Sequence, residues 1–199
     1  MLPVKIWIGL LLPLLLGASS NGLQPLHYDI VFNDNPIGRL AVTATATGTG
    51  VRYRADGLVV VHLLGEKSMK TLIISTYRDN TLTESSFLDK LNGKTKHDSR
   101  VIREGTGYRI QVNEDLSRLA NRRISYSTSS LYYQEPVGMK EVFSERHGQF
   151  CRLSPLGNHT YELVQPDGRK NRYRYVDGVC QEVEVNQRFF KFYFRLRKT

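Results

Sequence analysis

The segment FKFYFRLR, residues 190–197, alternates aromatic or aliphatic side chains with mostly charged ones. Successive side chains of a β-strand point to opposite faces of a sheet, so this spacing of two predicts one apolar face and one solvated face. The same period recurs in residues 27–32, 39–47, 51–55 and 108–112. We therefore expect an antiparallel sheet that is covered on one side only.

Turn signals separate these segments, among them residues 92–93, 166–168 and 177–178, where Asn-Gly or Asp-Gly tolerates the positive φ of tight hairpins. Their regular spacing predicts a mainly β fold, a single curved antiparallel sheet of about ten strands that forms an open barrel or half-barrel meander. One short helix is expected over residues 113–123, because Asn113 can cap it and Leu116 and Leu119 share one side. A further helical turn is expected at residues 130–134.

The N-terminal 20 residues resemble an export signal. Lys5 is their only charge, a Leu-rich core follows it, and Ala18 and Ser20 supply the small residues of a cleavage site. The alternative is an uncleaved anchor helix, which Pro13 and the short apolar length disfavour. We expect residues 1–20 to be a signal peptide and residues 21–199 a single β-rich domain. The mature chain would then be an exported monomer, in the periplasm or secreted, without an integral membrane span.

Composition supports a folded, basic domain. The chain has 199 residues, of which 40% are apolar, and a formal net charge of +9. Its 11 Tyr and 8 Phe exclude a disordered chain. Residues 169–174 and 188–198 mix cations with aromatic side chains, as proteins that bind single-stranded nucleic acid do. A solvated strand face explains the same pattern, and an exported location argues against nucleic acid as a partner.

Cys151 and Cys180 are the only thiols of the chain. In an oxidising compartment they could form a disulfide that stabilises the fold by about 3 kcal/mol. Two separate buried thiols are the equal alternative. Because the pair lacks Cys-x-x-Cys spacing, it indicates neither a metal site nor a redox motif.

Motifs for catalysis do not stand out. The five histidines are scattered, and neither Gly-x-Ser-x-Gly nor a phosphate-binding glycine motif occurs. We therefore expect no enzyme, no metal and no cofactor, although folding could still assemble distant residues into a catalytic site.

The leading hypothesis is a non-catalytic exported binding module that takes an apolar or lipid ligand on its concave face. A strongly curved sheet must fill its concavity with its own chain or with a ligand. The side chains expected to line it are inward-facing and apolar: Tyr28, Ile30, Phe32, Tyr53, Tyr108, Ile110, Leu116, Leu119, Phe190, Phe192 and Phe194. The alternative, which is favoured for each residue taken singly, is plain core. The alternative function is a structural or interaction protein of the cell envelope that holds a partner protein.

Several strand and turn motifs carry a family resemblance: Tyr28-Asp-Ile-Val-Phe32, Pro36-Ile-Gly38, Leu91-Asn-Gly-Lys94, Gly107-Tyr-Arg-Ile110, Leu131-Tyr-Tyr-Gln-Glu-Pro136, Tyr161-Glu-Leu163, Pro166-Asp-Gly168, Asn171-Arg-Tyr-Arg-Tyr175 and Asp177-Gly178. On these the chain resembles an uncharacterised family of exported bacterial envelope proteins of unknown function. More remotely it is similar to the half-barrels of periplasmic lipoprotein carriers. That likeness implies a curved sheet around short helices and an apolar concave face that accepts acyl chains.

Overall fold

The protein folds into one antiparallel sheet of fourteen strands, seen in a computed structural model that describes residues 23–62, 65–187 and 190–198. The first eight strands are β1 (Leu26–Phe32), β2 (Asn35–Thr47), β3 (Gly50–His62), β4 (Glu66–Arg78), β5 (Thr81–Leu91), β6 (Lys94–Glu104), β7 (Gly107–Val112) and β8 (Asp115–Leu119). The other six are β9 (Glu141–Ser144), β10 (Gln149–Gly157), β11 (Thr160–Val164), β12 (Lys170–Val176), β13 (Val179–Asn186) and β14 (Lys191–Leu196).

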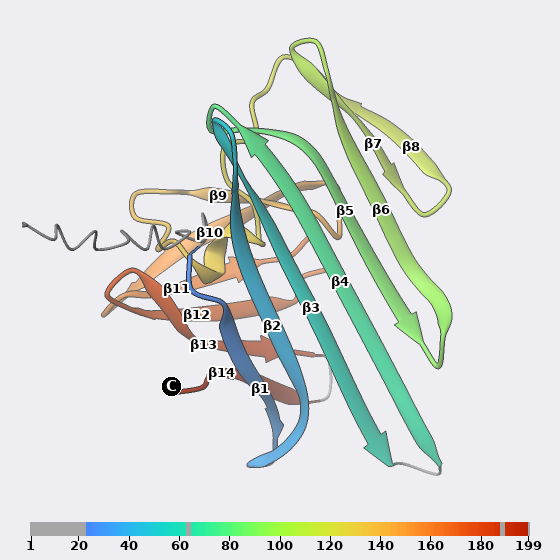
Figure 1. Ribbon diagram of the computed structural model, residues 1–199, viewed down its shortest axis with the longest axis vertical. Helices are drawn as coiled ribbons and strands as arrows, with labels where there is room; N and C mark the ends of the chain where they lie inside the picture. The colour runs from blue at the N-terminus through green and yellow to red at the C-terminus, as the bar shows by residue number, and fades with distance from the viewer. Residues whose placement is uncertain (1–22, 63–64, 188–189, 199) are drawn as a thin grey trace, which may run out of the picture.

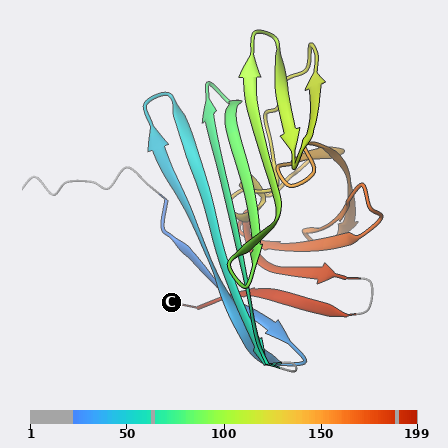
Figure 2. The same ribbon diagram turned by 90° about the vertical axis from the view of Figure 1, so that its right-hand side faces the viewer.

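The sheet consists of two meanders, β1–β8 and β9–β14, which are joined because the first strand, β1, pairs with the last, β14. Each strand pairs with its neighbour in the chain, except that β1 also pairs with β14 and that β8 and β9 form the two edges. Figures 1 and 2 show the sheet curving so that the long strands β2–β6 stand opposite the shorter strands β9–β14. The predicted open, curved antiparallel sheet is therefore confirmed, with more strands than the ten expected.

The concave side is filled in part by the chain itself. Residues 120–140, the crossing segment, run from the β8 edge to the β9 edge and include a 3-10 turn, η1 (Ser130–Tyr132). This segment buries Ile124, Tyr126 and Leu131. The β9–β10 hairpin also lies inside the curve, where Phe143 joins the core formed by β3, β4, β6 and β7. A second core forms between β1, β2 and β10–β13.

The predicted helix at residues 113–123 is wrong. Residues 115–119 form β8, which pairs with β7 so that Val112 lies opposite Asp115. Asn113 takes a φ of 51° in the two-residue loop between them, a conformation that Asn tolerates and that a hairpin requires. The expected turn at residues 130–134 is present as the 3-10 turn η1. The predicted signal peptide lies outside the described residues.

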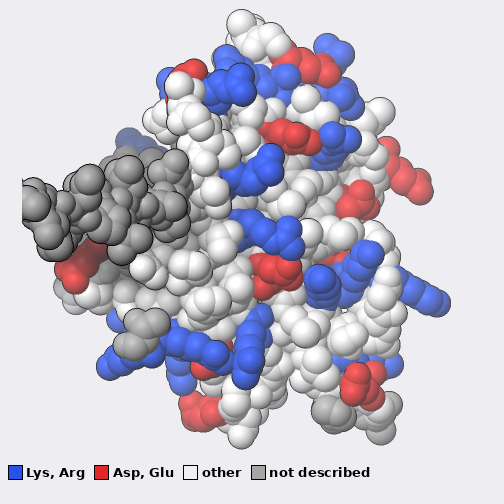
Figure 3. All heavy atoms as spheres, in the orientation of Figure 1, with Lys and Arg blue, Asp and Glu red and all other residues white. Residues whose placement is uncertain are grey.

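The outward face carries the charged side chains. Figure 3, which views this face over β2–β6, shows Lys and Arg dispersed among uncharged residues, with Asp and Glu between them. Cross-strand ion pairs join some of these charges, such as Arg100 on β6 with Glu84 on β5 at 2.9 Å. On the other half of the sheet, Arg172 on β12 pairs with Glu162 on β11 at 3.3 Å. Such exposed pairs contribute little to stability, so the face is the solvated one that the alternation predicts.

Candidate functional site

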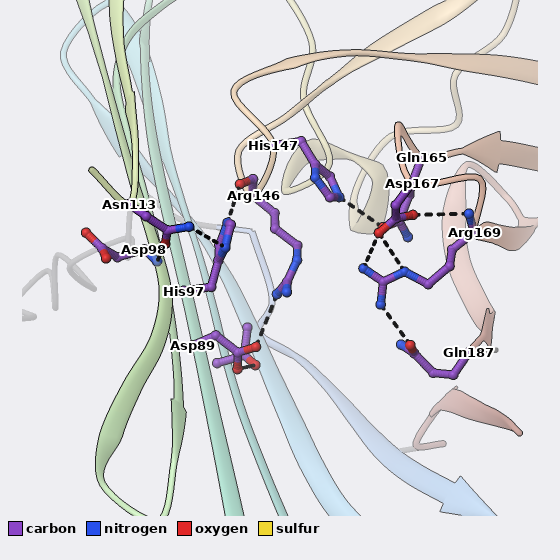
Figure 4. A network of polar contacts seen from close by, with 11 residues as sticks. Asp89, His97, Asp98, Asn113, Arg146, His147, Gln165, Asp167, Arg169 and Gln187 are labelled. Atoms are coloured by element: carbon purple, nitrogen blue, oxygen red, sulfur yellow. Dashed lines mark hydrogen bonds and ion pairs between the residues drawn. The ribbon is translucent and has the colours of Figure 1, made fainter. Parts of the chain in front are cut away.

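The turn between β9 and β10 presents a cation to the inward face of β4 and β5 (Figure 4). Arg146 Nη1 donates to Asp89 Oδ2 at 3.1 Å, and Thr71 Oγ1 donates to Asp89 Oδ1 at 2.9 Å. The Arg146 guanidinium also lies over the Phe87 ring, 5.0 Å from its centroid. A carboxylate and an aromatic ring thus orient this partly buried cation.

His97 on β6 holds the backbone of the same turn. Because a carbonyl oxygen only accepts, His97 Nε2 donates to Arg146 O over 2.8 Å. The Asn113 amide then donates to His97 Nδ1 at 3.3 Å. One imidazole therefore links the β7–β8 turn, β6 and the β9–β10 turn.

The contacts of Figure 4 form one polar cluster, whose other side lies at the β11–β12 turn. Here His147 Nε2 lies 3.1 Å from Gln165 Oε1. Arg169 donates from Nε and Nη2 to Asp167 Oδ2, at 2.8 Å and 2.5 Å, and from Nη1 to Gln187 Oε1 at 2.8 Å. Burial lowers the pKa of His147, and the hydrogen bonds from Arg169 lower the pKa of Asp167.

Glu145 anchors the β9–β10 turn to the rest of the fold. Its carboxylate is fully buried, and Oε1 accepts from Ser75 Oγ at 2.8 Å and from Ser127 Oγ at 2.7 Å. The backbone N–H groups of Thr128 and Ser129 donate to it at 3.1 Å each, and so does the Thr128 hydroxyl. A buried carboxylate is costly unless its oxygens are satisfied, and here hydroxyl and amide donors satisfy them.

Gly148 allows the same turn to lie flat on β7. It has a φ of +63°, and a Cβ at this position would stand 2.5 Å from Ile110 Cγ2. Only glycine meets both constraints without displacing the turn. Glu145 on one side and Gly148 on the other therefore fix where Arg146 and His147 point.

Beyond this turn the concave face is open. One row of inward-facing positions crosses the sheet through Leu91, Met69, Val59, Gly38 and, on β1, Ile30. Met69 and Leu91 are exposed and Val59 is partly exposed, although all three side chains point inward. The crossing segment and the β9–β10 hairpin thus cover only part of the concave face.

Phenylalanines continue this open end across β1 and β14. Their rings form a chain of contacts, from Phe194 to Phe192 at 5.6 Å, to Phe190 at 6.2 Å and on to Phe32 at 5.8 Å between centroids. Phe190 is 51% exposed, and the other three are partly exposed. Phe192 and Phe194 pack partly against the core between β1, β2 and β10–β13, so this phenylalanine chain runs from that core to the exposed ring of Phe190.

A cleft of about 620 Å³ opens at the rim beside the β11–β12 turn. Polar residues almost alone line it, including Arg169 and Gln187 from the cluster of Figure 4 and Lys170 and Glu162 from the outward face. Lys170 and Glu162 form an ion pair at 3.0 Å. The cleft therefore suits a polar group rather than an acyl chain.

The structure separates the residues predicted to line a ligand into groups. Five of them are buried in the two cores: Tyr28, Ile30, Tyr53, Tyr108 and Ile110. Leu119 packs against the core that contains Phe143, whereas Leu116 on the same strand points outward and is 70% exposed. The remaining four are the phenylalanine chain.

Cys151 and Cys180 are both buried free thiols in the structure. Burial raises the pKa of Cys151 to about 11 and that of Cys180 to about 12. Such thiols are poor nucleophiles at neutral pH. A disulfide between them stays a prediction.

The residues of the polar cluster are not among those predicted from the sequence. Glu145, Arg146 and His147 are adjacent in the chain, but their partners Ser75 and Asp89 are 70 and 57 residues away. The one local signal is Gly148, which marks a turn after an apolar strand.

Residues 23–62, 65–187 and 190–198 contain no group of three His, Cys, Asp or Glu side chains that could hold a metal ion. Within the same ranges, no helix has the length and apolar character needed to cross a membrane.

Fold and site together define an open, β-barrel-like protein with a partly uncovered concave face. The chain belongs to the family named domain of unknown function DUF6134, whose model matches residues 28–197. Its fold is similar to that of the beta-barrel-like protein of domain of unknown function DUF1849 from Brucella abortus. The TM-score is 0.59 at 10% sequence identity, covering 87% of this chain and 95% of that chain. No curated protein matches the chain.

Proposed function

We propose that this protein is a non-catalytic binding module that takes an apolar, lipid-like ligand at the open end of its concave face. The observation that carries the proposal is the phenylalanine chain, which leaves Phe190 half exposed and its other three rings partly exposed. The inward tyrosines Tyr28, Tyr53 and Tyr108 are buried by comparison. Contiguous exposed apolar surface on a folded protein is typical of a site that binds a ligand or a partner. The ligand would lie between these rings and the side chains of Met69 and Leu91.

Export is part of the proposal and rests on residues 1–20. A charged residue, a Leu-rich core and small residues before position 21 support cleavage after Ser20. N-terminal sequencing of the protein recovered from bacterial cells tests this directly. A mature chain that begins near Asn21 is expected, and an intact Met1 in the recovered protein would contradict export by cleavage.

The ligand is tested first on the native protein. Native mass spectrometry of the full chain purified from its own cells should show an added mass that organic extraction removes. The purified protein should also take up a fluorescent fatty-acid probe. A bare mass under gentle conditions together with no probe uptake would overturn the proposal.

Variants then locate the site. Phe190→Ala removes half-exposed apolar surface from the phenylalanine chain and should weaken probe binding by about 5-fold, the factor expected for losing part of one aromatic contact. Leu116→Ala is the matched control, because it removes an exposed apolar side chain from the outward side of β8. Equal effects of the two variants would place the probe elsewhere.

A protein partner is the second candidate function, and the β8 edge favours it. β8 ends the sheet order, so its outer backbone groups can accept a further strand. Cross-linking in intact cells distinguishes the two functions. One dominant protein adduct at β8, without a co-purifying lipid, would favour an interaction protein of the envelope over a ligand carrier.

A further inference from the structure

We propose that Arg146 binds the negatively charged head group of a single-chain amphiphile whose hydrocarbon chain lies along the open end of the concave face. The proposal rests on the function proposed above and adds the chemistry of the head group, a carboxylate or a phosphate ester. Its basis is the position of one oriented cation beside an unfilled apolar surface.

The Arg146 side chain has unused hydrogen-bond donors. Only Nη1 is engaged by Asp89, and within the described residues no hydrogen bond joins Nε or Nη2 to a partner. The side chain keeps 31% of its surface exposed although it lies over the Phe87 ring. A guanidinium presents five N–H donors in a plane, so most of this fork remains open to a carboxylate or phosphate.

The Arg146 guanidinium lies close to the inward apolar row of Leu91 and Met69. Asp89, which holds Arg146, is two residues before Leu91 on β5 and therefore points to the same face. Its cross-strand neighbour Thr71 is likewise two residues after Met69 on β4. Two residues of strand span about 7 Å, so a chain lying on Leu91 and Met69 can place its head group at Arg146.

Charges of both signs lie around the proposed head-group position. Figure 4 shows Arg146 between Asp89 on the sheet and the Arg169–Gln187 pair of the opposite side. Asp89 pairs with Arg146 and Asp167 pairs with Arg169, so these four charges cancel. The open N–H donors of Arg146 and the formal charge of +9 on the whole chain are what favour an anion, and Asp89 competes with it for Arg146.

Because Asp89 competes with the anion for Arg146, substitutions of these two residues should change the affinity for a charged amphiphile in opposite directions. Arg146→Gln removes the cation and should weaken the binding of a charged amphiphile, whereas Asp89→Asn releases the guanidinium and should strengthen it. Neither change should alter the binding of an uncharged amphiphile of the same chain length. Arg118→Gln is the control, because Arg118 lies on the edge strand β8 and is 79% exposed.

The experiment measures the affinity of the full mature chain for dodecanoate, dodecyl phosphate and dodecanol by calorimetry, at low salt and at a pH where the acids are ionised. We expect the wild type to prefer the charged compounds by about 10-fold, the factor of one charge-assisted hydrogen bond at a partly exposed site. Added salt should reduce that preference. Comparing the carboxylate with the phosphate identifies which head group is taken.

The outcomes separate the two proposals. Equal affinity of the wild type for dodecanol and the acids, or an undiminished preference in folded Arg146→Gln, would overturn the head-group site and leave the ligand function standing. Failure of all three compounds to bind would overturn both. A wider preference in Asp89→Asn supports the site even where Arg146→Gln folds poorly, because the aspartate variant keeps the cation.

Discussion

Replacing Glu145 by glutamine is the sharpest test of how the β9–β10 turn is held. Oε1 accepts from Ser75, Ser127 and Ser129, and an amide oxygen can take over part of this role. Oε2 accepts from both the amide and the hydroxyl of Thr128, and an NH2 group there would face two donors. One buried N–H without a partner costs about 1–3 kcal/mol, and weaker bonds to a neutral acceptor add about 1 kcal/mol. We therefore expect a loss of about 2–4 kcal/mol.

Equilibrium unfolding in urea, followed by circular dichroism, measures this loss as a lower midpoint with an unchanged slope. For a chain of this size the melting temperature should fall by about 5–15 °C. Glu84→Gln is the control, since Glu84 pairs with Arg100 on the solvated face and the same chemical change should cost about 0.5 kcal/mol or less there. If the two variants unfold at the same urea concentration, the buried carboxylate does not anchor the turn.

Three further predictions concern the same turn and the buried thiols. Gly148→Ala should lower the free energy of unfolding by about 1–3 kcal/mol, because its Cβ would stand 2.5 Å from Ile110 Cγ2 at a φ of +63°; an unchanged urea midpoint would contradict this. Cys151 and Cys180, with pKa values raised by burial to about 11 and 12, should react slowly with iodoacetamide in the native state and rapidly in urea. Mass spectrometry checks this, and rapid native labelling would show that the thiols are not enclosed. Burial lowers the pKa of His147 below the ordinary histidine value of 6.5, so protons bind the unfolded state more readily. Stability should therefore decline as the pH falls through 6.5 toward the lower folded pKa. His147→Asn should flatten that decline in urea titrations, and superimposable profiles would exclude His147 as its source.

The alternation of side chains predicts the sheet because it is a local property of each strand. Phe192 and Phe194 point inward and pair with Val185 and Val183, as the spacing of two requires. The helix expected at residues 113–123 is also predicted from a local pattern, because Leu116 and Leu119 are three residues apart and would share one face of a helix. In the structure β7 supplies backbone partners to this segment, and these cross-strand hydrogen bonds outweigh a weak helical preference.

The polar cluster could not be predicted in the same way. Its contacts join residues such as Arg146 and Asp89, which are 57 positions apart. No local pattern marks Glu145 as buried. With Arg146 and His147 directly after it, the sequence around it is typical of an exposed turn. Only the sheet topology, with β1 paired to β14 and the β9–β10 hairpin turned inward, brings these groups together.

The arrangement of the short strands explains why one end of the concave face is less covered. β9–β14 lie across the long strands and are stacked one above another (Figure 1). Six strands about 4.8 Å apart span about 24 Å, whereas the 13 residues of β4 span about 43 Å. The stack can therefore cover only about half the length of the long strands. Met69 and Leu91 occupy inward positions beyond this stack, and each keeps an apolar side chain that is 37% exposed among the described residues. A polar residue there would remove the unfavourable exposure of apolar surface, and the hydrocarbon chain of the proposed ligand would remove it by covering that surface.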